Sequence, residues 1–215
     1  MQEFKYMTKT IYLIRHGESV ANKQGIYQGQ SIDTGLTELG IKQARAAAKA
    51  LTGLKFKTIY TSPLIRAKET AQMIGNQTGL PILTNIKLLE INHGSWEGKK
   101  INEFNQTEQK LLNQWRKHPD QAQMLKGETL KDVASRCQRF IQSLPDGQET
   151  AVITHDVIIR VMTIMALKHK LKHIWRFTLD NGGITTVSFE PNCLISLNQN
   201  FHLNRIKSLL NRQAL

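Results

Sequence analysis

The sequence has few of the features that mark secreted, membrane-spanning or metal-binding proteins. Only two of its 215 residues are cysteine, and Cys137 and Cys193 are too few for a disulfide framework or a zinc site. The longest apolar run, residues 157–167, is interrupted by Arg160 and is too short to cross a bilayer. No apolar stretch of the signal-peptide type stands at the N-terminus. We therefore expect a cytoplasmic protein with no membrane association and no bound metal.

Acidic residues are also scarce. The chain has 17 Asp and Glu against 29 Lys and Arg, a formal net charge of +12. Such an excess is typical of proteins that bind nucleic acid or anionic membranes. The cations are dispersed, apart from a cluster at residues 168–176 and another formed by Arg205, Lys207 and Arg212, and no nucleic-acid-binding motif accompanies them. We expect solvated surfaces that attract anionic substrates, and consider a nucleic-acid partner less favoured.

Two short β-rich runs end directly in side chains that can carry positive charge. Residues 10–14 precede Arg15 and His16, and residues 151–154 precede His155. In open α/β sheets, ligands bind outside the carboxyl ends of the strands. These three side chains are therefore expected at one ligand site. Gly17 is expected to let the backbone turn closely around the ligand.

A third β-rich run, residues 58–61, leads into a helical pattern. Ser62 suits the N-cap and Pro63 the first helical position. Arg66 would then lie in the opening turns, where the helix dipole disfavours a cation, so an anion is expected nearby. Each feature alone is compatible with an ordinary surface charge or strand end. Their recurrence at three strand ends predicts a site for a phosphoryl group.

Four blocks of the chain, in order, resemble the histidine phosphatase superfamily, the phosphoglycerate-mutase-like enzymes. The blocks are RHGESVAN at residues 15–22, SPLIRAKETA at 62–71, LEINHGSWEG at 89–98 and VITH at 152–155. The resemblance extends from about residue 10 to residue 198. It implies an enzyme that transfers a phosphoryl group through a phosphohistidine.

The chain is long enough for one α/β domain and too short for two. Strand-like and helical patterns alternate without repeats or linkers. We therefore expect one domain over residues 1–215, with a core at about 10–198, folded as a three-layer α/β/α sandwich with a mainly parallel central sheet. The polar, helical stretch 99–126 is expected to form an excursion over the mouth of the active site.

His16 is the expected nucleophile, because a neutral imidazole can attack phosphorus near physiological pH. Arg15, Arg66 and His155 are expected to bind the phosphoryl oxygens, which makes catalysis mainly electrostatic and leaves no need for a metal or another cofactor. The resemblance adds Asn22 as a neutral donor. The polar loop at 25–33 is expected to bring two further residues to the substrate, Gln28 and Gly29.

One carboxylic acid is needed to protonate the leaving group and later to activate water. Chemistry alone leaves Glu18, Glu69, Glu90 and Glu97 as candidates, and the resemblance selects Glu90. Glu97 is expected to be a structural hydrogen-bond acceptor or a solvated charge. Asp156 departs from the family pattern, since an acid after the second histidine would repel phosphate. We expect its side chain to cap the helix that begins at Val157.

The acid-bearing segment resembles the phosphatase branches, which include metal-independent phosphoserine phosphatases and α-ribazole phosphatase. His93 and His202 resemble the phosphoserine branch and could receive a substrate carboxylate, although both are also compatible with ordinary surface residues. The expected substrate is a small phosphorylated metabolite such as phosphoserine. A phosphoglycerate mutase, an α-ribazole phosphatase and a non-enzymatic phosphate- or nucleic-acid-binding module are the alternatives. A homodimer is also considered.

Overall fold

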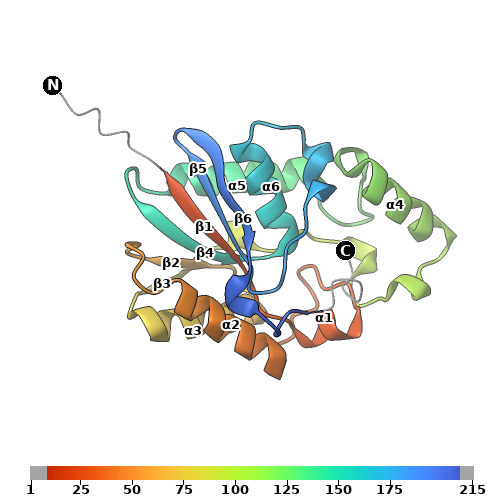
Figure 1. Ribbon diagram of the computed structural model, residues 1–215. Helices are drawn as coiled ribbons and strands as arrows, with labels where there is room; N and C mark the ends of the chain where they lie inside the picture. The colour runs from red at the N-terminus through yellow and green to blue at the C-terminus, as the bar shows by residue number, and fades with distance from the viewer. Residues whose placement is uncertain (1–8, 209–215) are drawn as a thin grey trace.

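The computed structural model describes residues 9–208, so Arg212 of the second basic cluster lies outside the described residues. A six-stranded sheet forms the centre of the protein, with helices on both faces (Figure 1). The strand order is β3-β2-β4-β1-β5-β6. The strands are β1 (Thr10–Arg15), β2 (Ile59–Thr61), β3 (Ile82–Thr84), β4 (Glu149–Thr154), β5 (Ile184–Phe189) and β6 (Asn192–Gln199). The first four strands in this order are parallel, β5 is antiparallel to β1, and β6 is antiparallel to β5, which confirms the predicted architecture.

Two pairs of helices form the outer layers. In Figure 1, α2 (Glu38–Ala50) and α3 (Ile65–Thr78) lie below the sheet, and α5 (Leu130–Ser143) and α6 (Asp156–Ala166) lie on its opposite face. Two further helices, α1 (Val20–Gln24) and α4 (Gln106–Lys117), lie toward the right-hand side of that view.

Alternation along the central strands explains why both faces are covered. Ile11 and Leu13 of β1 pack in one buried cluster with Phe140 of α5, whereas Ile14 packs in a second cluster with Ala47 of α2. Successive side chains of a strand point to opposite faces, so a strand that is apolar at nearly every position must be buried on both. The apolar run at residues 10–14 therefore already requires a sandwich.

The caps of α2 and α3 come from different parts of the chain. Thr37 accepts a hydrogen bond from the Gly40 amide at 3.0 Å, as an N-cap should. The predicted start of α3 is wrong, because the N-cap is Leu64 and not Ser62. Instead, Asp33 from a distant loop accepts hydrogen bonds from the Ile65 amide at 2.8 and 3.0 Å. Ser62 is left available for another contact, described below.

Residues 99–126 form α4 between short 3₁₀ turns. Asn105 caps α4 by accepting from the Glu108 amide at 2.9 Å. Leu112 and Trp115 anchor the helix in the main core cluster, together with Phe104 just before it. Figure 1 shows α4 beyond the edge of the sheet. Within residues 9–208, no helix is long and apolar enough to cross a membrane.

Candidate active site

The ends of three neighbouring parallel strands build the site. Arg15 at the end of β1 pairs with Thr154 of β4, and the His16 amide donates to the Thr154 carbonyl at 3.0 Å. The amide of Ser62, after β2, donates to a β4 carbonyl at 3.0 Å. The rings of His16 and His155 consequently lie 5.1 Å apart between centroids. The predicted meeting of these strand ends is thus present in the structure.

A small pocket opens at this place. Its volume is about 30 Å³, whereas a single buried water needs about 10–15 Å³. Eight of the ten predicted site residues line it: Arg15, His16, Asn22, Gln28, Gly29, Arg66, Glu90 and His93. The other lining residues are Ile26, Trp115, Asp156, Val157 and Trp175. A pocket of this size can hold a phosphoryl group.

His16 is held in one orientation and one protonation state. Its Nδ1 lies 2.7 Å from the carbonyl oxygen of Gly17, which requires the proton on Nδ1 and leaves Nε2 as the nucleophilic nitrogen. Asn181 donates to the His16 carbonyl at 3.1 Å and fixes the backbone. Burial, followed by the charges of Arg66 and Arg15, lowers the pKa of His16 well below its ordinary value. The imidazole is therefore neutral at physiological pH.

Gly17 is required for a different reason from the one expected. A Cβ atom at this position would lie 2.3 Å from the carbonyl oxygen of Gly40 in α2. Gly40 has the reciprocal constraint, since its own Cβ would lie 2.1 Å from the carbonyl oxygen of Glu18. The glycine thus allows the loop after β1 to pack against α2, and Gly17 does not line the pocket.

Two buried arginines each keep an unused donor. Arg15 donates from Nη1 to the Leu179 carbonyl at 2.7 Å, and Arg66 donates from Nη2 to the Gly29 carbonyl at 2.9 Å. The Nε atoms of both guanidinium groups are buried and have no hydrogen-bond partner in the structure. Buried donors of this kind normally have partners. Two unpaired cationic donors in residues that line one pocket call for an anionic ligand.

His155 completes the set beside His16. Its Nε2 lies 2.7 Å from the hydroxyl of Ser62, and its buried Nδ1 has no hydrogen-bond partner in the structure. Burial, with Arg66 and His16 as the main charged neighbours, lowers the pKa of His155 well below its ordinary value. Ser62 is therefore a positioning residue for the second histidine. Its assignment as a helix cap concealed this role.

Glu90 is the one of the four candidate acids that lines the pocket. It is 9% exposed, and its Oε1 accepts from the Ile91 amide at 2.9 Å. Burial, with a further contribution from the charge of Asp156, raises the pKa of Glu90 to about 7. A carboxyl group with that pKa can both donate and accept a proton near neutral pH.

The remaining candidate acids are occupied elsewhere. Glu18 accepts from the Thr37 hydroxyl at 2.9 Å, and Glu69 accepts from the Leu36 amide at 2.7 Å. Glu97 is the structural acceptor that the sequence suggested. It accepts from the amides of His93 at 2.8 Å and Gln30 at 3.1 Å, among other donors. The Glu97 carboxylate therefore joins the acid-bearing segment, residues 89–98, to the pocket loop, residues 25–33.

Asp156 does not cap the helix, which corrects the prediction made for it. α6 begins at Asp156 itself, and the carboxylate accepts from Arg160 Nε at 2.6 Å and lies 3.4 Å from Arg15 Nη1. Although burial disfavours the ionised form, Arg160 and Arg15 outweigh it and lower the pKa of Asp156. Two guanidinium groups are stronger partners for a carboxylate than helix amides. The negative charge is therefore balanced, and Asp156 helps to hold Arg15.

The two additional histidines have different positions. His93 lines the pocket, is 6% exposed and packs edge-on against Tyr27 with ring centroids 5.2 Å apart. Burial, followed by Arg66, lowers the pKa of His93 to about 4, and its buried Nδ1 has no partner in the structure. Neither His202 nor His155 is among the residues that line the pocket, but the ring of His155 lies beside that of His16. The Nε2 of His202 lies 2.9 Å from the Gly182 carbonyl, so the segment after β6 is held to the loop before β5.

Several contributors have no local signal in the sequence. Arg136 of α5 donates to the Glu90 carbonyl at 3.1 Å and to Glu128 at 2.9 Å. Trp115 and Trp175 form walls of the pocket from two segments that are distant in the chain. A helix arginine and two tryptophans are ordinary core or surface residues until the fold brings them to the site.

The described residues contain no cluster of metal ligands. Within residues 9–208, no group of three or more His, Cys, Asp or Glu side chains could hold one. The unpaired donors of Arg15, Arg66 and His155 instead suit the oxygens of an anion. The geometry fits phosphoryl transfer stabilised by protein cations.

Comparison with known proteins agrees with this chemistry. The family described as Histidine phosphatase superfamily (branch 1) matches residues 11–201. Phosphoserine phosphatase 1 of Hydrogenobacter thermophilus is 32% identical over 92% of this chain and 95% of its own. Adenosylcobalamin/alpha-ribazole phosphatase of Escherichia coli is 28% identical over 95% of this chain and 97% of its own. The solved structure of Bacillus stearothermophilus YhfR superposes with a TM-score of 0.85 at 28% identity, over 91% of this chain and 99% of that one.

Proposed function

The chain belongs to the histidine phosphatase superfamily and is a phosphatase, and we propose that its substrate is phosphoserine. The observation that carries this proposal is His93. Its buried Nδ1 has no partner in the structure, and the residue lines the same pocket as His16 and Glu90. A neutral imidazole can donate one hydrogen bond to a substrate carboxylate.

In the proposed mechanism, Nε2 of His16 attacks phosphorus while the bond from phosphorus to the ester oxygen breaks. Arg15, Arg66 and His155 stabilise the three equatorial oxygens. Glu90 gives its proton to the departing serine oxygen. In the second step, Glu90 takes a proton from water, the water oxygen attacks phosphorus, and the bond to His16 breaks to release phosphate. No metal ion is needed in either step.

A substrate panel in EDTA tests the substrate and the metal independence together. We expect the highest kcat/KM with L-phosphoserine, above phosphoglycerates, sugar phosphates, nucleotides and α-ribazole phosphate. Preference for α-ribazole phosphate would favour the activity named for the Escherichia coli relative. Transfer between phosphoglycerate hydroxyls, faster than hydrolysis, would instead indicate a mutase. Loss of all activity in EDTA, restored by Mg²⁺, would contradict the mechanism.

The proposed contact of His93 has its own test. His93→Ala should raise KM for phosphoserine about tenfold, with little change for phenyl phosphate, which has no carboxylate. His202→Ala is the matched control, because His202 does not line the pocket. An equal effect of His93→Ala on both substrates would show that the residue only shapes the pocket.

The proposed nucleophile is tested by rapid quench. Acid-labile phosphate should be trapped on the protein during turnover and located at His16, and His16→Ala should abolish it. Trapping on a different residue would refute the assignment.

The proposed acid is tested by varying the leaving group. Glu90→Gln should slow phosphoenzyme formation from phosphoserine by about 10²–10⁴-fold. A nitrophenyl phosphate should be much less affected, because nitrophenolate leaves without a proton. The exposed Glu38→Gln serves as the control carboxylate. Equal slowing of both substrates in Glu90→Gln would exclude Glu90 as the acid.

Location and assembly are also proposals. Cys137 and Cys193 are both free thiols, which suits the reducing cytoplasm. The β6 strand at the edge of the sheet exposes Ile195, and Phe201 beyond it is 93% exposed, so a second copy of the chain could cover this side. Cell fractionation and sedimentation equilibrium would test the two proposals.

A further inference from the structure

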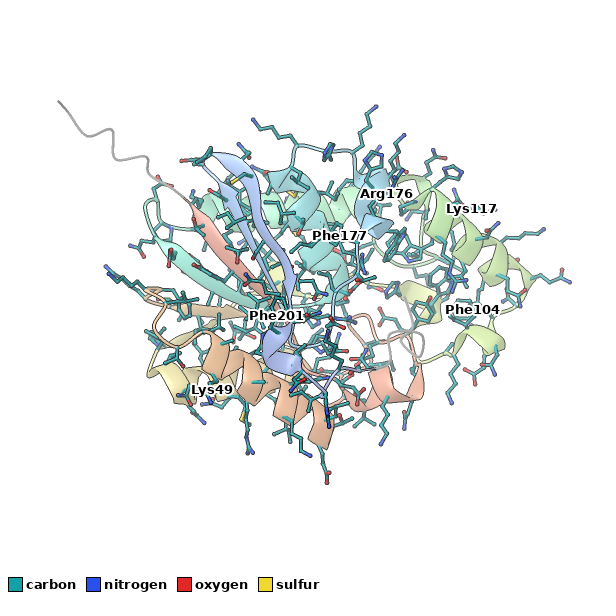
Figure 2. The ribbon with its side chains drawn as sticks, viewed as in Figure 1. Lys49, Phe104, Lys117, Arg176, Phe177 and Phe201 are labelled. Atoms are coloured by element: carbon teal, nitrogen blue, oxygen red, sulfur yellow. The ribbon has the colours of Figure 1, made fainter. Side chains whose placement is uncertain are left out.

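A second, larger concavity lies outside the catalytic pocket and is lined by basic residues apart from one tryptophan. It has a volume of about 360 Å³ and forms between the end of α4 and the 3₁₀ helix at Leu171–Arg176. Figure 2 shows Lys117 and Arg176, one from each of these elements, on the same upper right part of the molecule. We call this concavity the basic groove. Its basic residues are Arg116, Lys117, His118, Lys172, His173 and Arg176.

Among the described residues, no acid lines the basic groove to balance its positive charge, although Asp120 lies two residues after His118. The Lys and Arg side chains of the groove make no ion pair within residues 9–208. Partial desolvation and the charges of Arg176 and Lys172 lower the pKa of His173, which is the response expected from a site that repels further protons.

The helix end accounts for only part of this charge. Arg116 and Lys117 occupy the last turn of α4, where cations interact favourably with the helix dipole. Lys172 and Arg176 come from the other element and do not belong to α4. Holding four like charges around one groove costs free energy, and a bound anion would recover it.

The basic groove adjoins the catalytic pocket through a shared wall. Trp175 lines both cavities. Its Nε1 donates to the Trp115 carbonyl at 2.8 Å, and the guanidinium of Arg160 lies 4.9 Å from its ring centroid. The indole is therefore fixed by contacts on two sides. A ligand that extends from the catalytic pocket past Trp175 meets four exposed cationic side chains.

We propose that the basic groove is a second phosphate-binding site, separate from the site of hydrolysis. Clustered Arg and Lys donors match the several oxygens and the double charge of a phosphate group. The phosphate has two sources: the distal group of a bisphosphorylated substrate whose first phosphate occupies the catalytic pocket, or a free inorganic anion. This site does not depend on phosphoserine being the substrate.

The test uses a charge-matched pair of variants. Lys172→Gln/Arg176→Gln removes two exposed charges from the basic groove. Lys49→Gln/Lys68→Gln removes two exposed charges from α2 and α3, on the other side of the sheet, and so reproduces the loss of net charge. Figure 2 shows Lys49 at the lower left, far from Arg176 in that view. Because all four side chains are exposed, both variants should fold, and circular dichroism and urea unfolding would check that they do.

The first arm measures kcat/KM for a hexose bisphosphate and for the matching monophosphate. If the distal phosphate occupies the basic groove, the wild type prefers the bisphosphate, and the groove variant loses that preference by about tenfold or more while the control variant keeps it. The second arm measures calorimetric binding of inorganic pyrophosphate with the catalytic pocket filled by orthovanadate. A free-anion site gives a binding event that only the groove variant removes.

Either arm supports the proposal, and the pair identifies the source of the phosphate. The proposal is overturned if neither arm distinguishes the groove variant from the control variant. It is likewise overturned if the groove variant only loses salt-sensitive retention of an oligonucleotide, which would make the groove a nucleic-acid surface. Failure of phosphoserine in the substrate panel leaves both arms unchanged, so the two proposals fail separately.

Discussion

At the scale of single residues, burial sets two protonation states in opposite directions. Desolvation disfavours the charged form of any group, so it lowers the pKa of His16 and raises the pKa of Glu90 to about 7. Near neutral pH the nucleophile is therefore unprotonated while the acid still carries a proton in much of the population. One buried environment thus prepares both partners of the reaction.

The pH dependence of kcat/KM should report the raised pKa of Glu90. With phosphoserine, kcat/KM is expected to fall above about pH 7, because the free enzyme then loses the proton that the leaving group needs. The substrate does not cause this fall, since its second phosphate pKa is about 6. In Glu90→Gln the profile above pH 7 should be flat at a lower level. A profile with the same fall in Glu90→Gln would assign it to another group.

The folding stability of the protein should depend on pH because the pKa of Glu90 is raised in the folded state. The pKa of Glu90 is about 7 when folded and 4.5 ordinarily, so the folded state holds the proton more tightly. This contribution to stability is complete below pH 4.5 and is lost as pH rises through about 7. The free energy of unfolding of Glu90→Gln, relative to that of the wild type, should therefore be about 2 kcal/mol higher at pH 8 than at pH 5. Urea unfolding at both pH values measures it, with the exposed Glu38→Gln as control. Equal differences at both pH values would contradict the raised pKa.

At the scale of elements, a buried clamp from α5 positions the acid-bearing segment. Arg136 donates to the carbonyls of Lys87 at 2.8 Å and Glu90 at 3.1 Å. Glu128 accepts hydrogen bonds from Arg136 Nε at 2.9 Å and from the side-chain amide of Gln30 at 3.2 Å. The clamp therefore links the helix, the acid and the pocket loop in one network.

Loss of this clamp should affect the chemical step more than binding. We expect Arg136→Met to lower kcat by about ten- to a hundredfold with little change in KM, because small displacements of a catalytic group are costly. The falling limb of the pH profile should also move to higher pH, since Arg136 is a cation that lowers the pKa of Glu90. Arg139→Met on the exposed side of α5 is the matched control. A change in stability alone, without a shift of the pH profile, would leave Arg136 a purely structural residue.

At the scale of the whole molecule, the net charge of +12 should act on encounter with the substrate. Long-range attraction between a cationic protein and a phosphate dianion accelerates association and is screened by salt over about 10 Å at 0.1 M. The substrate would be attracted to two adjacent places, the unpaired donors of the catalytic pocket and the cationic side chains of the basic groove.

Ionic strength should therefore change kcat/KM several-fold between about 0.01 and 0.5 M salt and leave kcat nearly constant. Stopped-flow or initial-rate measurements in sodium chloride and in potassium glutamate at equal ionic strength would check this. An effect that follows the identity of the anion would indicate competition for a site and not screening.

The sequence alone determined the architecture and the principal chemistry. The nearly continuous apolar runs at residues 10–14 and 151–154 required a sheet buried on both faces, and such patterns can be read from the sequence because they involve only neighbours within a few residues. The placement of Arg15, His16 and His155 followed from the rule that parallel strands end at one edge. The resemblance of the four blocks then selected Glu90 among the acids.

Only the tertiary structure decided which partner each side chain meets. Asp156 pairs with Arg15 and Arg160 and does not cap the helix. Ser62 hydrogen-bonds to His155, and Asp33 accepts from the first amide of α3 in its place. His202 lies at Gly182 outside the pocket, and Trp175 joins the pocket to the basic groove. These outcomes, like the pKa values, depend on burial and on contacts between segments far apart in the chain, which no local pattern encodes.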